Sequence, residues 1–254
     1  MSMTRVIERP ADRQAAHSSI DLDAYIAKGF AVVRGVFGAD EPASWRAECD
    51  RLVRLVRQPG GLDVQTQLRA HIAGGAVLDR IEMVADASAT FGQLATDDRL
   101  LALAGHVLHR RPALLKDKLI VKAPGTTGYL MHQDYPYWEP LGIPAGAITT
   151  IMLSIDAADA GNGAPELFPG LHHGKLAAPP EEPRDVDESQ IDLGRGVIVP
   201  MAPGDVLLFH SLVPHRSGVN HSSRSRRALF LTYTAQEYAD AYRAFHRSRD
   251  GAAP

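Results

Sequence analysis

The sequence is poor in three features that mark particular classes of protein. It has one cysteine, Cys49, in 254 residues, which excludes an intramolecular disulfide and favours a reducing compartment. It has no apolar run of membrane-spanning length, and residues 1–19 contain no apolar signal core. The formal net charge of −3 gives no general attraction to nucleic acid or to an anionic membrane. We therefore expect a cytoplasmic protein with neither nucleic acid nor membrane as partner; the sequence leaves its oligomeric state open.

Length and texture predict a single domain that follows a short arm. Residues 1–19 are polar and charged, so we expect a flexible N-terminal arm there and one domain over residues 20–254. Caps and helical periodicity then predict three helices, from Asp21 to Lys28, from Glu41 to Arg57 and from Asp97 to Leu108. An apolar strand is expected between the first two, at Phe30–Val33.

From Leu114 onward, short apolar strands alternate with proline and glycine. Strands are expected at 114–122, 129–132, 148–155, 197–200, 205–210 and 228–233. This pattern predicts a mainly β fold with flanking helices, a jelly-roll core (a double-stranded β-helix of the cupin type) buttressed by the N-terminal helices. The acidic, proline-rich segment Pro179–Gly194 lies between two of these strands, and its length and composition predict a mobile lid.

A set of polar residues within the strand-rich part indicates a metal site. His132-Gln133-Asp134 is the only His-x-Asp in a chain with 11 histidines, and His215 follows His132 by 83 residues (215 − 132). Alternation along a strand would put His132 and Asp134 on one face. Two imidazoles and one carboxylate form the ligand set that holds non-haem Fe(II) and leaves positions open for other ligands.

Arg226 lies 11 residues beyond His215 (226 − 215), which is one strand further along the chain. A guanidinium there can take a carboxylate bidentately, as suits the far end of a 2-oxo diacid whose near end chelates the iron. Two other interpretations remain open. The same three ligands could hold Zn²⁺ and a water for hydrolysis, although a hydrolase has no need of this arginine. A non-catalytic metabolite-binding jelly roll would need no intact iron site.

Ordered blocks around these residues resemble one family. The phytanoyl-CoA dioxygenase family of Fe(II)/2-oxoglutarate oxygenases is similar to this chain over roughly residues 20–236. The blocks that carry the resemblance are Leu119–Gly125, Met131–Asp134, Asp159–His172, Pro203–His210, His215–Asn220 and Arg226–Ala228. It implies that His132, Asp134 and His215 bind iron and that Arg226 binds the C5 carboxylate of 2-oxoglutarate. It also implies that Ser217, Thr150 and Tyr129 assist in binding this co-substrate.

The resemblance further implies a dioxygenase that uses 2-oxoglutarate and O₂ and releases succinate and CO₂. Asp134 stands where halogenating relatives carry a small residue, which favours hydroxylation of an unactivated C–H bond. Known substrates of the family range from fatty acyl-CoA to phosphonates and natural products. We expect a small molecule here, in particular a bacterial secondary metabolite.

Candidate substrate residues follow from the same resemblance and from side-chain chemistry. Trp138 stands six residues after His132, where ectoine-hydroxylating relatives carry a tryptophan that contacts the substrate. Tyr135 and Tyr137 beside it offer further stacking faces. Lys116 and Lys118 share one face of a strand and could meet an anionic group.

Overall fold

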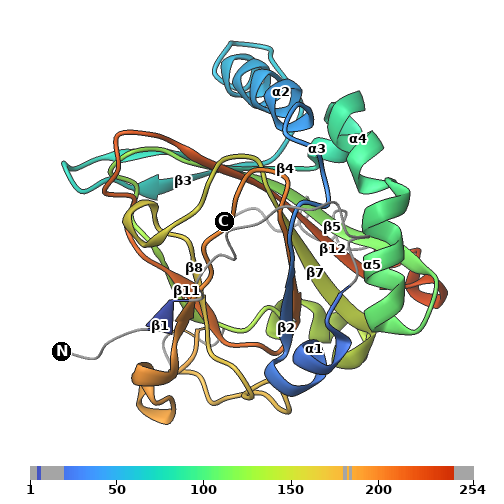
Figure 1. Ribbon diagram of the computed structural model, residues 1–254. Coiled ribbons are helices and arrows are strands. Elements are labelled where there is room, and N and C mark those ends of the chain that lie inside the picture. The colour runs from blue at the N-terminus through green and yellow to red at the C-terminus, as the bar shows by residue number, and fades with distance from the viewer. Residues whose placement is uncertain (1–4, 7–19, 180–181, 183–184, 243–254) are drawn as a thin grey trace.

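The computed structural model of the chain describes residues 5–6, 20–179, 182 and 185–242 (Figure 1). Most of the predicted N-terminal arm lies outside these residues. Its described part is β1 (Arg5–Val6), which pairs in parallel with β9 (Val197–Ile198). None of the helices within the described residues has the length and apolar character needed to cross a bilayer.

The first predicted helices are present, and their ends have clear physical causes. α1 (Leu22–Lys28) begins at Asp21, whose carboxylate accepts a hydrogen bond from the Ala24 amide at 2.8 Å. It ends at Gly29, whose φ of +83° suits a residue without a Cβ. α2 (Glu41–Leu55) stops two residues before the predicted end, because the amide of Arg57 bonds three residues back in a tighter turn.

The third predicted helix is α5 (Asp98–Leu108), which Asp97 caps through the Arg99 amide. The sequence analysis did not predict three short helices: α3 (Val84–Ala87), α4 (Ala89–Ala95) and α6 (Tyr135–Trp138).

Two facing sheets confirm the predicted jelly-roll fold. The smaller sheet has the described strand order β1-β9-β8-β11-β6 and the larger one β2-β10-β7-β12-β5-β4-β3. All strand pairings among the described residues except that of β1 with β9 are antiparallel. The remaining strands are β2 (Phe30–Val33), β3 (Thr66–Ala70), β4 (Ala76–Glu82), β5 (Pro112–Lys122), β6 (Tyr129–His132), β7 (Ile148–Ser154), β8 (Pro165–Leu167), β10 (Val206–His210), β11 (His215–Ser217) and β12 (Arg226–Ala235).

The larger sheet is covered on one face and faces the smaller sheet on the other. Its outer face packs against α2, α4 and α5, which Figure 1 shows on the side away from β8 and β11. Trp45, Leu52 and Phe91 of these helices are buried in one cluster with Leu119 and Leu229 of the sheet. The buttress of N-terminal helices is therefore confirmed, and the inner faces of the two sheets are left to form a second core and a site.

The predicted lid segment is packed where the structure describes it. Val186 and Ile191 are buried against Met131 and Phe168, and the Val186 amide donates to the Met131 carbonyl at 2.9 Å. Two short 3₁₀ turns, Glu188–Gln190 and Leu193–Arg195, follow. Mobility of Pro179–Gly194 stays a prediction, but any movement of its second half would break these contacts.

Candidate metal centre

Two neighbouring strands of the smaller sheet bring the predicted histidines together. His132 ends β6, His215 begins β11, and the two residues are direct cross-strand partners whose ring centroids lie 4.2 Å apart. The strands approach closely beside them: a Cβ on Gly128 would lie 1.9 Å from the Ser217 carbonyl oxygen. Glycine at this position therefore permits the pairing that puts the imidazoles side by side.

Asp134 reaches the histidines by a route that the sequence analysis did not predict. Strand alternation is wrong here, because β6 ends at His132 and Asp134 is helical (φ −71°, ψ −29°) at the start of α6. Gln133 between them is buried, and its side-chain amide donates to the Leu212 carbonyl at 2.6 Å. This bond anchors the turn. It leaves the Asp134 Oδ1 atom 3.7 Å from His132 Nε2.

The three side chains have the protonation states that a divalent metal needs. One potential ligand atom from each lies within 4.8 Å of the others. The Nδ1 atoms of His132 and His215 lie 2.8 and 2.9 Å from the carbonyl oxygens of Leu130 and Val213, respectively. A carbonyl only accepts, so each Nδ1 carries the proton and each Nε2 keeps a lone pair for a metal.

Burial and the neighbouring His215 lower the pKa of His132 to about 3, so this imidazole is neutral near pH 7. Burial alone would raise the pKa of Asp134, but Lys118 and the two histidines more than offset it and keep the pKa below its usual value. Two neutral imidazoles and one ionised carboxylate are the donors that non-haem Fe(II) binds. The residues present therefore fit this metal.

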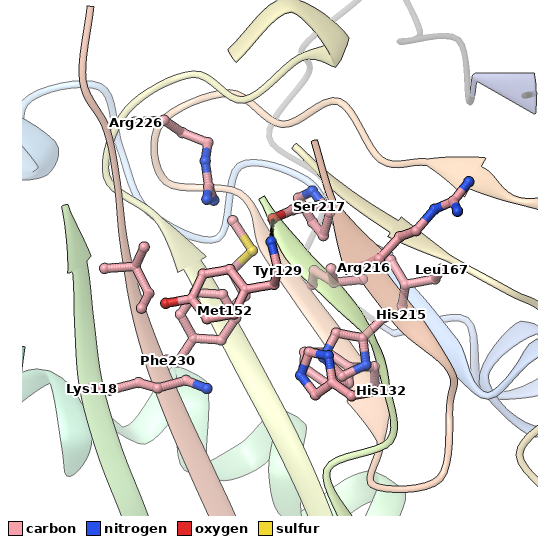
Figure 2. Close-up of a pocket in the computed structure, with 14 residues that line it drawn as sticks. Lys118, Tyr129, His132, Met152, Leu167, His215, Arg216, Ser217, Arg226 and Phe230 are labelled. Atoms are coloured by element: carbon pink, nitrogen blue, oxygen red, sulfur yellow. Dashed lines mark hydrogen bonds between the residues drawn. The ribbon is translucent and has the colours of Figure 1, made fainter. Parts of the chain in front are cut away.

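A cavity between the sheets connects this centre to Arg226. The space open to the centre of a water-sized sphere within it is about 50 Å³. Figure 2 shows His132 and His215 on one side and Arg226 at the other end, with Tyr129, Met152 and Phe230 between them. The two candidate histidine ligands and the predicted carboxylate receptor Arg226 thus face one space.

Arg226 is buried in this cavity, and its surroundings leave it free for an anion. Its Nε atom has no hydrogen-bond partner among the described residues. The residue lies on β12, one strand further along the chain than His215 as expected, and β12 belongs to the larger sheet, which faces β11. A buried guanidinium without a full set of acceptors is costly unless an anion completes it.

Lys122 adds a second cation that sequence reasoning missed. It is the direct cross-strand partner of Arg226, and its Nζ donates to Ser217 Oγ at 3.2 Å and to the Thr127 carbonyl at 3.1 Å. Burial, aided by Arg226, lowers the pKa of the Lys122 ammonium to about 7. The sequence contained one signal for this residue, because Lys122 directly follows the apolar run 119–121 of a predicted strand. Ser217 lies where predicted and also accepts from the Tyr129 amide at 3.2 Å.

Tyr129 is held by two further residues that sequence reasoning missed. Its hydroxyl donates to the buried Asp79, which also accepts from Arg69 Nε at 3.0 Å. The Arg69 guanidinium lies 3.6 Å from the centre of the Tyr129 ring. The tyrosine ring therefore forms a fixed wall between Arg226 and the histidines, as Figure 2 shows.

Two predicted residues are engaged elsewhere in the structure. Thr150 is buried, and its hydroxyl lies 3.1 Å from the hydroxyl of Thr232. Lys116 is buried and forms an ion pair with Glu82 at 3.0 Å. Neither is among the described residues that line the cavity. Their roles in binding co-substrate and substrate stay predictions.

The three predicted aromatic residues also lie outside the described cavity wall. Trp138 is 3% exposed and packs in a cluster of its own with Leu115, Ile143 and Ile148. Tyr135 packs against that cluster, and Tyr137 is 39% exposed. Their contact with a substrate stays a prediction.

His210 lies near the centre but belongs to a different environment. Its Nδ1 accepts a hydrogen bond from the Leu212 amide at 3.1 Å, and its ring centroid lies 5.5 Å from that of His172. Burial, followed by the charges of His172 and His173, lowers the pKa of His210 from 6.5 to about 4. The residue does not line the cavity in the described structure.

We expect the protein to lose stability between pH 6.5 and pH 4, in part through His210. The pKa of His210 is lower in the folded protein than in the unfolded chain. Its contribution to the free energy of unfolding is therefore complete above the unfolded pKa of 6.5 and is lost as pH falls toward 4. A pKa shift of this size corresponds to a loss of roughly 1–3 kcal/mol in the free energy of unfolding, once the partial exposure of the His210 side chain is allowed for. Urea unfolding of wild type and His210→Asn at pH 7 and pH 4.5 measures it, since Asn keeps the acceptor without titrating. An equal acid loss in both proteins would contradict this role.

Comparison with known proteins identifies the family of this chain. The family model described as phytanoyl-CoA dioxygenase (PhyH) matches residues 25–228, which include all three candidate metal ligands and Arg226. The chain belongs to the phytanoyl-CoA dioxygenase family. This family consists of Fe(II)/2-oxoglutarate-dependent dioxygenases. The predicted membership over roughly residues 20–236 is thereby confirmed.

Curated relatives in this family act on small molecules. The chain is 33% identical over 174 residues to a methylphosphonate hydroxylase of Gimesia maris, covering 65% of each chain. It is 30% identical over 169 residues to a 2-aminoethylphosphonate dioxygenase of an uncultured bacterium, covering 63% of this chain and 60% of the relative. The matched stretch is thus less than two thirds of the length of either relative.

Solved structures of the same fold contain the expected ligands. Ectoine hydroxylase EctD from S. alaskensis, with 2-oxoglutarate and 5-hydroxyectoine bound, gives a TM-score of 0.71 at 21% identity and covers 91% of this chain and 80% of that one. The epimerase SnoN, with Fe³⁺, 2-oxoglutarate (alpha ketoglutarate) and a nogalamycin compound, gives 0.69 at 22% identity and covers 84% and 82%. These likenesses confirm the jelly-roll fold.

Proposed function

We propose that the protein is an Fe(II)- and 2-oxoglutarate-dependent dioxygenase that hydroxylates a C–H bond of a small molecule. The observation that carries this proposal is one cavity that reaches His132 and His215 of the metal triad on one side and Arg226, the cross-strand partner of Lys122, at its far end. 2-Oxoglutarate has two anionic ends separated by a short apolar chain. Its 2-oxo end suits the metal, and its C5 carboxylate suits Arg226 and Lys122.

Each residue then has a defined task. His132, Asp134 and His215 would hold the iron, and the hydrogen bonds from their Nδ1 atoms keep the two imidazoles oriented. Arg226 would bind the C5 carboxylate through its planar fork, while the fixed ring of Tyr129 limits where the co-substrate lies. When bound, iron and 2-oxoglutarate supply the oxidising chemistry, with O₂ consumed and succinate and CO₂ released. The apolar walls, including Met152, Phe209 and Phe230, exclude water from this space.

The two alternative functions use less of this arrangement. A zinc hydrolase would use the triad but would have no task for a buried Arg226 with an unsatisfied Nε atom. A non-catalytic binding protein would need neither the neutral imidazoles nor the ionised carboxylate. The cation pair and the triad together favour the dioxygenase.

Among small molecules, a phosphonate is the first substrate class to test. The two curated relatives described above are named for methylphosphonate and 2-aminoethylphosphonate. The sequence-based expectation of a bacterial secondary metabolite stays a prediction, because the likeness to SnoN and SnoK from nogalamycin biosynthesis lies below 25% identity.

We expect succinate formation only when Fe(II), 2-oxoglutarate and O₂ are all present. The direct test measures succinate with each component omitted in turn, and 2-oxoglutarate binding without O₂ by calorimetry. Tight anaerobic binding of 2-oxoglutarate that depends on metal supports the proposal. Hydrolytic activity with Zn²⁺ in the absence of O₂, without binding of 2-oxoglutarate, would replace it by the hydrolase.

A further inference from the structure

Lys118 is a cation in the cavity that belongs neither to the candidate metal ligands nor to the pair formed by Arg226 and Lys122. It lies on β5 and lines the cavity together with His132, His215 and Phe230. Figure 2 shows its side chain extending from β5 toward the two histidines, while Arg226 enters the same space from the other end. The ammonium group therefore stands at the metal side of the cavity.

Among the residues that the structure describes, none acts as a counter-ion that holds Lys118. Glu82 is its direct cross-strand neighbour, but Glu82 pairs with Lys116 and Arg80, each at 3.0 Å. Lys118 makes no hydrogen bond or ion pair with any described residue, and its Nζ lies 5.1 Å from the centre of the Phe230 ring. Its side chain is thus placed in the cavity without being used to hold the fold together.

The surroundings make an unneutralised ammonium unfavourable. Burial lowers the pKa of Lys118, and the charge of Asp134 opposes that shift most strongly. Asp134 forms no ion pair with the lysine, and its carboxylate belongs to the metal ligand set. A bound divalent ion beside Lys118 would add positive charge. An anion that enters with the substrate would supply the missing partner.

The C5 carboxylate of 2-oxoglutarate cannot be that partner while Arg226 and Lys122 bind it. If Lys118 instead bound the C1 carboxylate at the metal end, replacing the lysine would weaken 2-oxoglutarate binding. Arg226 pairs across the sheet with Lys122, whereas Lys118 stands four residues earlier on β5. At about 3.3 Å per residue, the Cα atoms of Lys118 and Lys122 are about 13 Å apart. One C5 carboxylate cannot meet both ends of that strand. The other end of the co-substrate chelates the metal.

We infer that Lys118 binds a compact oxyanion, a phosphonate or a carboxylate, on the primary substrate and so places the neighbouring C–H group at the metal. This inference rests on the proposed function. The wall around Lys118 is apolar, with Ile120, Leu167 and Phe209 among its residues, so a short hydrocarbon segment beside the anion would be packed while the anion is paired. Of the two lysines that share this strand face, Lys116 is already occupied by Glu82 and Lys118 is the one available.

The test compares anion binding by four proteins: wild type, Lys118→Met, Lys118→Arg and the control Lys28→Met. Lys28 is an exposed lysine at the end of α1, away from the cavity. Each protein is loaded with Fe(II) and 2-oxoglutarate without O₂, and methylphosphonate, 2-aminoethylphosphonate, acetate and propionate are titrated by calorimetry. The phosphonate and carboxylate arms identify which oxyanion the site prefers.

At least one of these anions should bind the wild type. The same anion should bind Lys118→Met with an affinity lower by roughly tenfold or more, because a charge-assisted contact is lost. Lys118→Arg should retain part of the affinity, Lys28→Met all of it, and binding of 2-oxoglutarate should be unchanged throughout. Equal anion binding by Lys118→Met, loss of 2-oxoglutarate binding in that variant, or no anion bound by wild type would each overturn the inference. A wild type that binds neither Fe(II) nor 2-oxoglutarate would instead remove the proposed function on which the inference rests.

Discussion

Replacing His215 with alanine is expected to abolish succinate formation and to weaken Fe(II) binding by more than about 100-fold. The loss is large because His215 supplies one of only three candidate ligands, and removal of mere supporting partners of a metal ligand already costs about 10–100-fold. The same result is expected for His132→Ala and Asp134→Ala. Anaerobic titration with Fe(II), followed by a succinate assay in air, measures both effects.

The matched control for the triad is His210→Asn. This histidine is five residues from His215 in the sequence but lies outside the cavity wall of the described structure. Its variant should bind Fe(II) and form succinate normally at pH 7. Product formation by His215→Ala at stoichiometric iron would show that another group completes the centre.

Arg226→Ala is expected to weaken 2-oxoglutarate binding by about 2–5 kcal/mol, seen mainly as a higher KM for 2-oxoglutarate. The variant leaves a carboxylate in a buried cavity with Lys122 as its remaining cation. Fe(II) binding should survive because Arg226 is not a metal ligand. Arg226→Lys should rescue only in part, since it restores charge without the planar fork. Saturation kinetics with 2-oxoglutarate test all three expectations.

Arg227→Ala separates this effect from general damage to β12. The Arg227 guanidinium lies on the outer face, where it pairs with Asp156 at 2.7 Å and with Asp50 at 2.8 Å. Its loss should lower the melting temperature while the KM for 2-oxoglutarate stays near the wild-type value. Equal increases in KM for the two variants would mean that the co-substrate does not bind through Arg226.

Much of the fold could be predicted because local signals coincide with the elements that pack. Asp21 and Gly29 mark both ends of α1, and the apolar runs that became β5, β7 and β10 have continuous buried faces. The β3–β4 hairpin was not predicted. The burial of β3 is low along most of its length, so it has no apolar pattern to detect. β8 and β11 are three residues long, too short for any periodicity.

The site shows the same division between local and long-range information. His132, His215 and Arg226 have chemical types and spacings that the sequence displays directly. The turn that carries Asp134 depends on the hydrogen bond of Gln133 to Leu212, a contact 79 residues away that no local pattern encodes. Lys118 and Lys116 look alike on one strand, and only the position of Glu82 on β4 decides which of them is available.

The direct pairing of His132 with His215 also makes the metal part of the architecture. These residues are 83 positions apart (215 − 132), and each lies at one end of a short strand, β6 or β11. An ion bound by both would act as a cross-link between the two strands, so its binding free energy also resists their separation. Removing the metal with a chelator would therefore loosen this end of the jelly roll. The thermal stability of the smaller sheet should rise with the concentration of free metal.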